Sequence, residues 1–166
     1  MRTLYLLRHA KSSWDDPELP DRERPLAPRG VRDAKRIARH MRRLEIAPGL
    51  VLCSPAVRAR QTLEPIEAKV PDAPVDVDER LYSASSETLL ERVRAIPDEV
   101  ASVLLIGHNP GVQELALLLA SRGDELEWLE AKFPTAALAT LSLARWSSLR
   151  VGDAELSAYV VPKQLR

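Results

Sequence analysis

Two short stretches of the sequence place a histidine directly behind an apolar run. The first is LLRHAKSSW, residues 6–14, in which Arg8 and His9 follow the run. The second is LLIGHNPGV, in which His108 follows it. A histidine in such a place can be a base, a metal ligand, a nucleophile or a bystander. A neutral imidazole nitrogen is a competent nucleophile near pH 7. The residues around the two histidines must show which of these roles applies.

A third stretch, CSPAVRARQT, supplies arginines. It follows the apolar run LVLC, and we expect Arg58 and Arg60 on the first turns of a helix that starts near Pro55. Guanidinium groups donate paired hydrogen bonds to phosphate oxygens and stay charged at every relevant pH. Two arginines and two histidines in one crevice therefore suit a phosphoryl group, with covalent transfer through a histidine and no metal.

A metal site is the competing interpretation. His9 and His108 could bind a cation together with Asp15 or Asp16, but the adjacent arginines would oppose it and no His-x-x-x-His spacing is present. Cys53 is the single cysteine, which excludes an internal disulfide and a multi-thiolate zinc site. We interpret it as a small buried apolar residue and expect no metal and no cofactor.

The elements that position these residues follow from periodicity. Continuous apolar runs are typical of strands buried on both faces, and steps of three and four residues are typical of helices packed on a sheet. The sequence predicts strands at 3–7, 50–53 and 102–106, a short one at 74–77, a hairpin of 137–143 and 156–161, and helices at 30–46, 86–95 and 111–121. The prediction is an α/β fold: three layers, a mostly parallel central sheet, helices on both faces, and one domain spanning residues 1–166.

This fold would bring the chemical groups together. In open α/β sheets, ligands bind at the carboxyl ends of the strands, which is where the motifs lie. A further loop, VDERLYSA, places Glu79 behind the short strand. Residues 11–30 contain four prolines and no periodicity, and a loop of this length in a compact domain is usually functional or disordered. We favour a function because it begins directly behind His9.

The three motifs resemble those of a known superfamily. Arg8-His9-Ala10 resembles the Arg-His-Gly signature of the histidine phosphatase superfamily, with alanine in place of the glycine. This resemblance implies the phosphoglycerate mutase-like fold. SPAVRARQT is similar to its second arginine motif, and GHNPG to its second histidine motif. Within the superfamily, RHAKSSWDD, DRERPLAPRGVRDA and the short chain are most similar to the phosphohistidine phosphatase group typified by bacterial SixA.

The resemblance implies a role for each residue. His9 is the nucleophile that becomes phosphorylated, with its other ring nitrogen held by a hydrogen bond. Arg8 and Arg58 clamp the phosphate, and His108 donates to a phosphate oxygen. Glu79 stands where phosphomonoester-cleaving members of the family carry the residue that protonates the leaving oxygen. Its alternative is a solvated surface carboxylate.

Five further polar positions can be interpreted in the same way. We expect Ser12 and Asn109 to contact the substrate. Asp15 stands where several mutase relatives carry an asparagine that touches phosphate, and a carboxylate there would repel it, so hydrolysis is favoured over mutase activity. Arg60 is expected to point elsewhere, and His40 is interpreted as solvated surface on the basic helix.

Charge and hydropathy limit the partners. The 24 Lys and Arg residues balance 24 Asp and Glu residues, so nucleic acid and membrane are not expected as partners. The basic helix face is the one weak argument for nucleic acid. No segment is long enough to span a bilayer or to serve as a targeting peptide, which favours a cytoplasmic location. The substrate is a phosphorylated protein or a small phosphate ester, and a phosphate-binding module without turnover is the alternative from another class.

Overall fold

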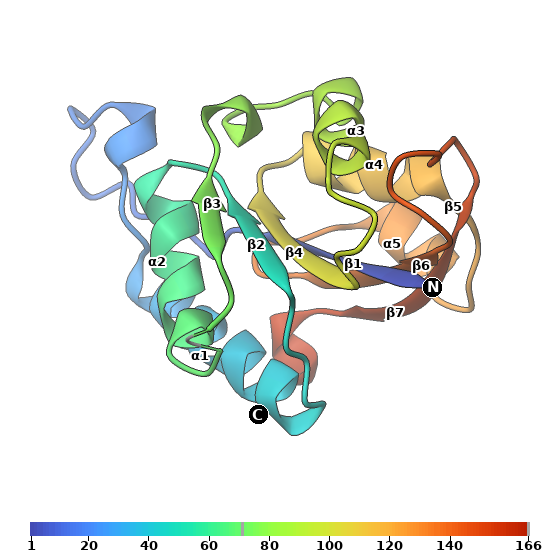
Figure 1. The fold of residues 1–166 in the computed structure, drawn as a ribbon. Helices are drawn as coiled ribbons and strands as arrows, with labels where there is room; N and C mark the ends of the chain where they lie inside the picture. Colours follow the sequence, from blue (N-terminus) through green and yellow to red (C-terminus); the bar gives the residue numbers. More distant parts are fainter. Residues whose placement is uncertain (71, 166) are drawn as a thin grey trace.

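The computed structural model describes residues 1–70 and 72–165 and contains one seven-stranded sheet. The strand order across the sheet is β3-β2-β4-β1-β6-β7-β5 (Figure 1). The strands are β1 (Arg2–Arg8), β2 (Leu50–Cys53), β3 (Val75–Val77), β4 (Ser102–Gly107), β5 (Ala120–Arg122), β6 (Leu138–Leu143) and β7 (Ala154–Val160). Strands β3, β2, β4 and β1 run parallel, and β6 is antiparallel to both of its neighbours. The predicted mostly parallel sheet and the predicted hairpin are confirmed.

Helices cover both faces of this sheet, as predicted. One layer contains α1 (Pro28–Arg43) and α2 (Val57–Glu67), and the other contains α3 (Ser86–Arg94), α4 (Gly111–Leu119) and α5 (Leu126–Ala131) (Figure 1). The alternation of side chains along a strand produces two cores. On β1, Leu4 and Leu6 join the core under α3 and α4, whereas Leu7 joins the core under α1 and α2. Two buried faces explain why this strand is apolar without interruption.

The register of the parallel strands sets the position of the functional loops. Arg8 pairs with Gly107, and Cys53 pairs with Ile106, so β1, β2 and β4 end at the same edge of the sheet. The next residues along the chain are therefore neighbours in space. They include both histidines of the motifs.

Some element boundaries differ from the prediction. Helix α1 begins at Pro28, two residues early, because proline suits the first helical position. Its last helical residue is Arg43, and Glu45 has a left-handed φ of 55° that ends the helical path. The predicted helix 111–121 stops at Leu119, since residues 120–122 leave it to pair with β7 as β5. Helix α5 was missed, because six residues are too few for a clear period.

The long loop after β1 is ordered by its own contacts. Its ends are joined by a bridge between Ser12 and Leu26, and the Ala27 N–H donates to the Lys11 carbonyl (2.9 Å). A short 3-10 helix, Asp21–Glu23, lies between them. Gly30 follows at the start of α1, where a Cβ would lie 2.1 Å from the Lys11 carbonyl oxygen. A side chain at position 30 would therefore push this loop away from α1.

Within the described residues, none of the helices has the length and apolar character needed to cross a membrane.

Candidate active site

His9 follows the carboxyl end of β1 and is buried, with 8 % of the residue exposed. Its Nδ1 is 2.8 Å from the Ala10 carbonyl oxygen, which can only accept a hydrogen bond. The proton therefore sits on Nδ1, and Nε2 keeps its lone pair. The Ala10 N–H in turn donates to Thr62 Oγ1 (2.9 Å), which fixes this turn against α2. The geometry presents Nε2 as the reactive nitrogen.

Arg58 connects the two histidines. Its Nε lies 3.4 Å from His9 Nε2, and its Nη2 lies 3.5 Å from His108 Nδ1. It is only 6 % exposed, whereas Arg60 on the same helix is exposed to solvent. Arg58 therefore lies against the two histidines and Arg60 does not, and the catalytic role of Arg58 stays a prediction. Two residues along a helix differ by about 200°, which explains the opposite directions.

His108 lies beside His9 at the end of β4. The ring centroids of the two histidines are 5.0 Å apart, and Tyr82 packs edge-on against His108 at 5.5 Å. His108 Nε2 lies 2.7 Å from Ser54 Oγ. Because Arg58 can only donate toward Nδ1, Nε2 carries the proton and donates to Ser54. The serine at the end of β2 thus orients the second histidine.

Arg8 points its guanidinium into the same region. Its Nη1 donates to the Phe133 carbonyl (3.0 Å), and the Arg8 and His9 carbonyls both accept from the Ala136 N–H. Among the described residues, Arg8 Nε is the one buried side-chain nitrogen or oxygen without a hydrogen-bond partner. An orphaned buried donor is costly unless a ligand supplies an acceptor. We call Arg8, His9, Arg58 and His108 the central group.

Burial controls the charge of the two imidazoles. Desolvation lowers the pKa of His9 to about 3, with the nearby His108, Arg58 and Arg8 acting in the same direction and the Ala10 carbonyl opposing it. Desolvation likewise lowers the pKa of His108 to about 4. Both rings are therefore neutral at pH 7 in the free protein. A neutral His9 is the form that can attack phosphorus.

The loop of residues 11–27, called the flanking loop, contacts the central group through Asp21. The Asp21 carbonyl accepts from Arg58 Nη1 (2.6 Å), and its carboxylate accepts from Arg58 Nη2 (2.9 Å) and from the Tyr82 hydroxyl (2.6 Å). The Tyr82 hydrogen bond and Arg58 lower the pKa of Asp21 to about 2. This carboxylate stays charged and holds the Arg58 fork in place. The loop thus contacts the site through Asp21, and its predicted function stays a prediction.

Glu79 lies at the start of a short 3-10 helix, Glu79–Leu81, and its side chain is 69 % exposed. Its carboxylate pairs with Arg22 of the flanking loop. The hydrogen bond from Arg22 lowers the pKa of Glu79, which favours the charged form over a proton donor at neutral pH. The structure brings Glu79 to the rim of the site by way of this loop, and its catalytic role stays a prediction.

Ser12 and Asn109 are engaged by the protein itself. Ser12 Oγ accepts from Arg24 Nη2 (2.6 Å), and Arg24 also stacks on Trp14 with its Cζ 3.2 Å from the ring centroid. The Asn109 amide nitrogen donates to the Phe133 carbonyl (3.1 Å), while its oxygen accepts from the Gln113 N–H (3.2 Å). Asn109 directly follows His108 in the chain, whereas Ser12 is held by Arg24 within the loop after β1. Their contact with substrate stays a prediction.

The remaining candidates lie further from the chemistry. Asp15 is exposed on the flanking loop, and His40 is half-buried on α1 rather than fully solvated, because its ring packs partly against the protein. Cys53 is fully buried, and burial raises the pKa of its thiol to about 12. This supports its interpretation as a packing residue.

Sequence reasoning missed four residues that position the site: Ser54, Thr62, Tyr82 and Asp21. Ser54 and Thr62 stand in the same CSPAVRARQT stretch as Arg58, at the strand end and one helical turn beyond Arg58. Their proximity to the motif was a usable signal. The contact between Asp21 and Arg58 spans 37 residues and involves an irregular loop, so no local pattern indicates it.

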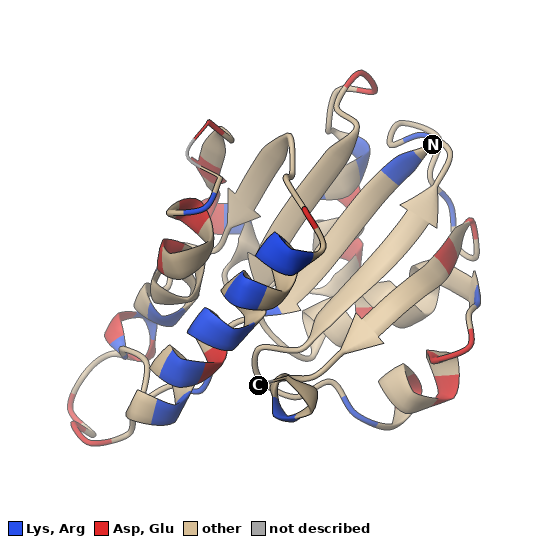
Figure 2. Cartoon of the chain, turned by 90° about the horizontal axis from the view of Figure 1, so that it is seen from below, with Lys and Arg blue, Asp and Glu red and all other residues tan. Residues whose placement is uncertain are grey.

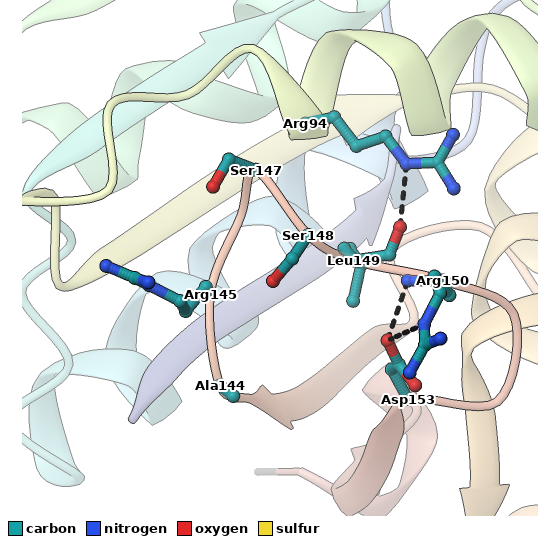
Figure 3. Close-up of a pocket in the computed structure, with 8 residues that line it drawn as sticks. All are labelled: Arg94, Ala144, Arg145, Ser147, Ser148, Leu149, Arg150 and Asp153. Carbon is teal, nitrogen blue, oxygen red and sulfur yellow. Dashed lines mark hydrogen bonds and ion pairs between the residues drawn. The ribbon is translucent and has the colours of Figure 1, made fainter.

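A large cavity of about 770 Å³ lies away from this site. Its lining includes Arg94, Arg145 and Arg150 near the turn between β6 and β7. Figure 3 shows the three guanidinium groups directed apart: Arg94 reaches toward the Leu149 carbonyl, Arg150 toward Asp153, and Arg145 to the other side. The cavity therefore lacks the convergence of charge found around His9.

The fold and the central group together define a phosphatase of the phosphoglycerate mutase-like class. The model of the histidine phosphatase superfamily (branch 1) matches residues 4–117, and the chain belongs to this superfamily. It is accordingly a hydrolase of the phosphatase type. The matched region includes all three motifs, so the superfamily predicted from them is confirmed.

Individual relatives extend this similarity to the whole chain. An uncharacterized protein of Mycobacterium leprae is 40 % identical over 164 residues, covering 95 % of this chain and 100 % of the relative. A Nakamurella multipartitia protein assigned as the phosphohistidine phosphatase SixA superposes with a TM-score of 0.86 at 30 % identity, over 97 % of this chain and 96 % of that one. The protein histidine phosphatase SixA complexed with tungstate superposes with a TM-score of 0.80 at 26 % identity, over 98 % of each chain. The similarity to the SixA type is confirmed.

Proposed function

We propose that this protein removes phosphate from phosphohistidine on a protein, without a metal and through a covalent phosphate on His9. The observation that carries the proposal is the orientation of His9. Its Nδ1 is committed to the Ala10 carbonyl, and its Nε2 faces Arg58 within the central group. The likeness to SixA proteins supports the substrate class.

The reaction proceeds in two displacements. In the first, the His9 Nε2 lone pair forms a bond to phosphorus while the phosphorus bond to the substrate nitrogen breaks, and a substrate ring already protonated by solvent on its other nitrogen leaves as neutral imidazole. In the second, water attacks phospho-His9 and gives up one proton to solvent, which releases inorganic phosphate and restores the neutral ring. Arg8 and Arg58 stabilise the charge on the phosphoryl oxygens in both transition states.

Substrate binding changes the state of His108. In the free protein its Nδ1 is unprotonated and faces Arg58. A phosphate dianion placed beside the ring would raise its pKa, because an opposite charge nearby favours the protonated form. His108 then donates from Nδ1 to a phosphate oxygen while Nε2 remains bonded to Ser54. The unpartnered Arg8 Nε supplies a further donor for the same group.

The leaving group distinguishes this substrate from small phosphate esters. An alkoxide has a conjugate acid with a pKa of about 15 to 16, judged by water, whereas that of imidazole is about 6.5. Phosphohistidine therefore needs much less help from a general acid. Glu79, charged and paired with Arg22, fits a reaction with little need for one. A phosphomonoesterase that acts on small sugar or nucleotide phosphates is the second candidate, favoured by the position of Glu79 at the rim.

Turnover of two substrates by one variant tests the proposal. Wild type and Glu79→Gln are assayed on a phosphohistidine protein and on a simple phosphomonoester. The matched control is Glu87→Gln, which removes the charge of an acidic residue on α3. We expect the wild type to turn over phosphohistidine faster than the monoester. Glu79→Gln should change the rate on phosphohistidine by less than ~3-fold. Preference for the monoester, with a loss of ~100-fold or more in Glu79→Gln, would establish the second candidate instead.

A further inference from the structure

A second, smaller cavity lies between the first half of α1, the segment before β6 and the last turn of the chain. Its volume is about 350 Å³, within the usual range of small-molecule sites. It is lined by Arg29, Asp33, Arg36, Trp128, Lys132, Pro134, Thr135, Val161, Pro162 and Lys163. Figure 2 shows the row of basic residues on α1 and, beside this helix, the turn at the C-terminus.

The charge of this cavity is strongly positive in a chain whose total charge is balanced. Four cationic side chains from three separate segments line it, and Asp33 is the one carboxylate among the lining residues. Asp33 is buried and already accepts from Arg36 Nη1 (3.0 Å), with Arg29 Nε 3.9 Å away. Lys132 and Lys163 carry exposed ammonium groups opposite α1. The excess of positive charge favours an anionic ligand.

The rest of the lining is apolar and contains a tryptophan. Val161 and Pro162 are buried at the base, and Pro134 adds to the wall. The Trp128 and Tyr159 rings pack in a T-shaped arrangement, with centroids 5.3 Å apart at 83°, yet 37 % of Trp128 is exposed. A tryptophan that lines the cavity and keeps this much accessible surface offers a platform on which a flat ring can stack. The ligand should therefore combine negative charge with a planar ring.

The cavity is close to the central group but separate from it. Lys132 and Pro134, which line it, flank Phe133, whose carbonyl accepts from both Arg8 and Asn109. None of the central-group residues is among its lining residues. A ligand there would contact the residues on either side of Phe133, whose carbonyl braces Arg8.

From this combination we propose that the cavity is a second ligand site, which binds a nucleoside polyphosphate. The base stacks on Trp128, and the phosphates bind the cations of α1, Lys132 and Lys163. The proposal goes beyond the phosphatase activity and does not depend on its substrate.

Isothermal titration calorimetry with ATP, in low salt and without divalent metal, tests this site. All titrations use the His9→Ala background, so that turnover is suppressed. The Lys132→Gln/Lys163→Gln pair leaves the partners of buried Asp33 intact, and Arg42→Gln/Arg43→Gln at the far end of α1 is the matched control with the same change of charge. We expect ATP affinity to fall roughly tenfold in the first pair and to stay within about twofold in the control.

Two further titrations separate the contribution of the base from that of the phosphates. Trp128→Ala should weaken ATP binding several-fold but leave inorganic tripolyphosphate binding unchanged, and adenosine alone should bind more weakly than ATP. Thermal denaturation checks that Trp128→Ala remains folded. If ATP does not bind, or if both charge pairs weaken it equally, the proposal is wrong. ATP binding that the Lys132→Gln/Lys163→Gln pair leaves unchanged would place the ligand elsewhere and also overturn it.

Discussion

The central group and the flanking loop surround the same space but are held in place by different forces. The central group is largely buried and stands on the ends of β1 and β4 and on the first turn of α2, with Ser54, Thr62 and backbone carbonyls fixing its side chains. The flanking loop is more exposed, and besides the backbone bridge between Ser12 and Leu26 it is held by ion pairs such as that of Arg22 with Glu79. Buried hydrogen bonds are insensitive to salt, whereas exposed ion pairs are weak and screened.

This difference assigns the two regions different tasks: the central group is preorganised for the chemical step, and the flanking loop controls access to the site. A rigid, water-poor group of donors stabilises developing charge without having to reorganise during the reaction. The loop can respond to solvent and substrate because several of its ion pairs are exposed and weak. We therefore expect substitutions in the central group to act on the chemical step, and substitutions in the loop to act on opening and binding.

Loss of Arg58 should give the largest effect. Arg58→Ala removes a donor shared by both histidines, so kcat should fall about 10² to 10³-fold. Arg60→Ala, on the exposed side of the same helix, should change kcat by less than ~2-fold. Steady-state kinetics on phosphohistidine protein measures both, with circular dichroism to verify folding. Equal losses in the two variants would contradict the distinction between a buried clamp and a surface arginine.

Removal of Ser54 should give an intermediate effect. Ser54→Ala deletes the partner of His108 Nε2 and leaves the ring free to change tautomer or rotate. A lost hydrogen bond of about 1.4 kcal/mol corresponds to a roughly tenfold fall in kcat/KM. Thr88→Ala, at a helix start away from the site, is the control. An unchanged kcat/KM in Ser54→Ala would mean that His108 needs no orientation.

The buried histidines should also make stability depend on pH. Burial lowers the pKa of His9 to about 3 and that of His108 to about 4, below the unfolded value of about 6.5. The unfolded chain then binds more protons in mild acid, so the histidine contribution is complete above pH ~6.5 and is lost as pH falls toward the folded values. Urea unfolding between pH 7.5 and 5 should show this decline, reduced in His9→Gln and less affected in His40→Gln. An unaltered slope in His9→Gln would refute the buried neutral state.

The smallest effect should come from salt acting on the flanking loop. Raising the salt concentration from low to ~0.5 M should increase hydrogen exchange of amides in the flanking loop about 2- to 5-fold and leave β1 and β4 unchanged. Asp21→Asn should produce a similar increase at low salt, because it weakens the pairing with Arg58, whereas Asp16→Asn should not. Exchange that is independent of salt would show that the loop is held mainly by its apolar and backbone contacts.

The same contrast explains what could be predicted from the sequence. The strands that carry His9 and His108 are apolar runs with clear ends, and the parallel sheet then brings those ends together. The separation of Arg58 from Arg60 follows from helical geometry. These features depend on local patterns and on one rule of topology.

The flanking loop could not be predicted in the same way. Its contacts with Arg58, Tyr82 and Glu79 join residues 37 to 61 positions apart in the chain, through side chains of an aperiodic segment. The short elements β5 and α5 were missed for a related reason, since three and six residues carry too little periodicity. Tertiary contacts decide the conformation of such segments.

Trapping of the phosphoenzyme tests the central claim most directly. Wild type and His9→Ala are mixed with radiolabelled phosphohistidine protein in a single turnover and quenched separately in acid and base. The account predicts label on wild type that is lost in acid, survives in base and is absent from His9→Ala. Phosphate release without any label on wild type, or an equal label on His9→Ala, would contradict His9 as the nucleophile.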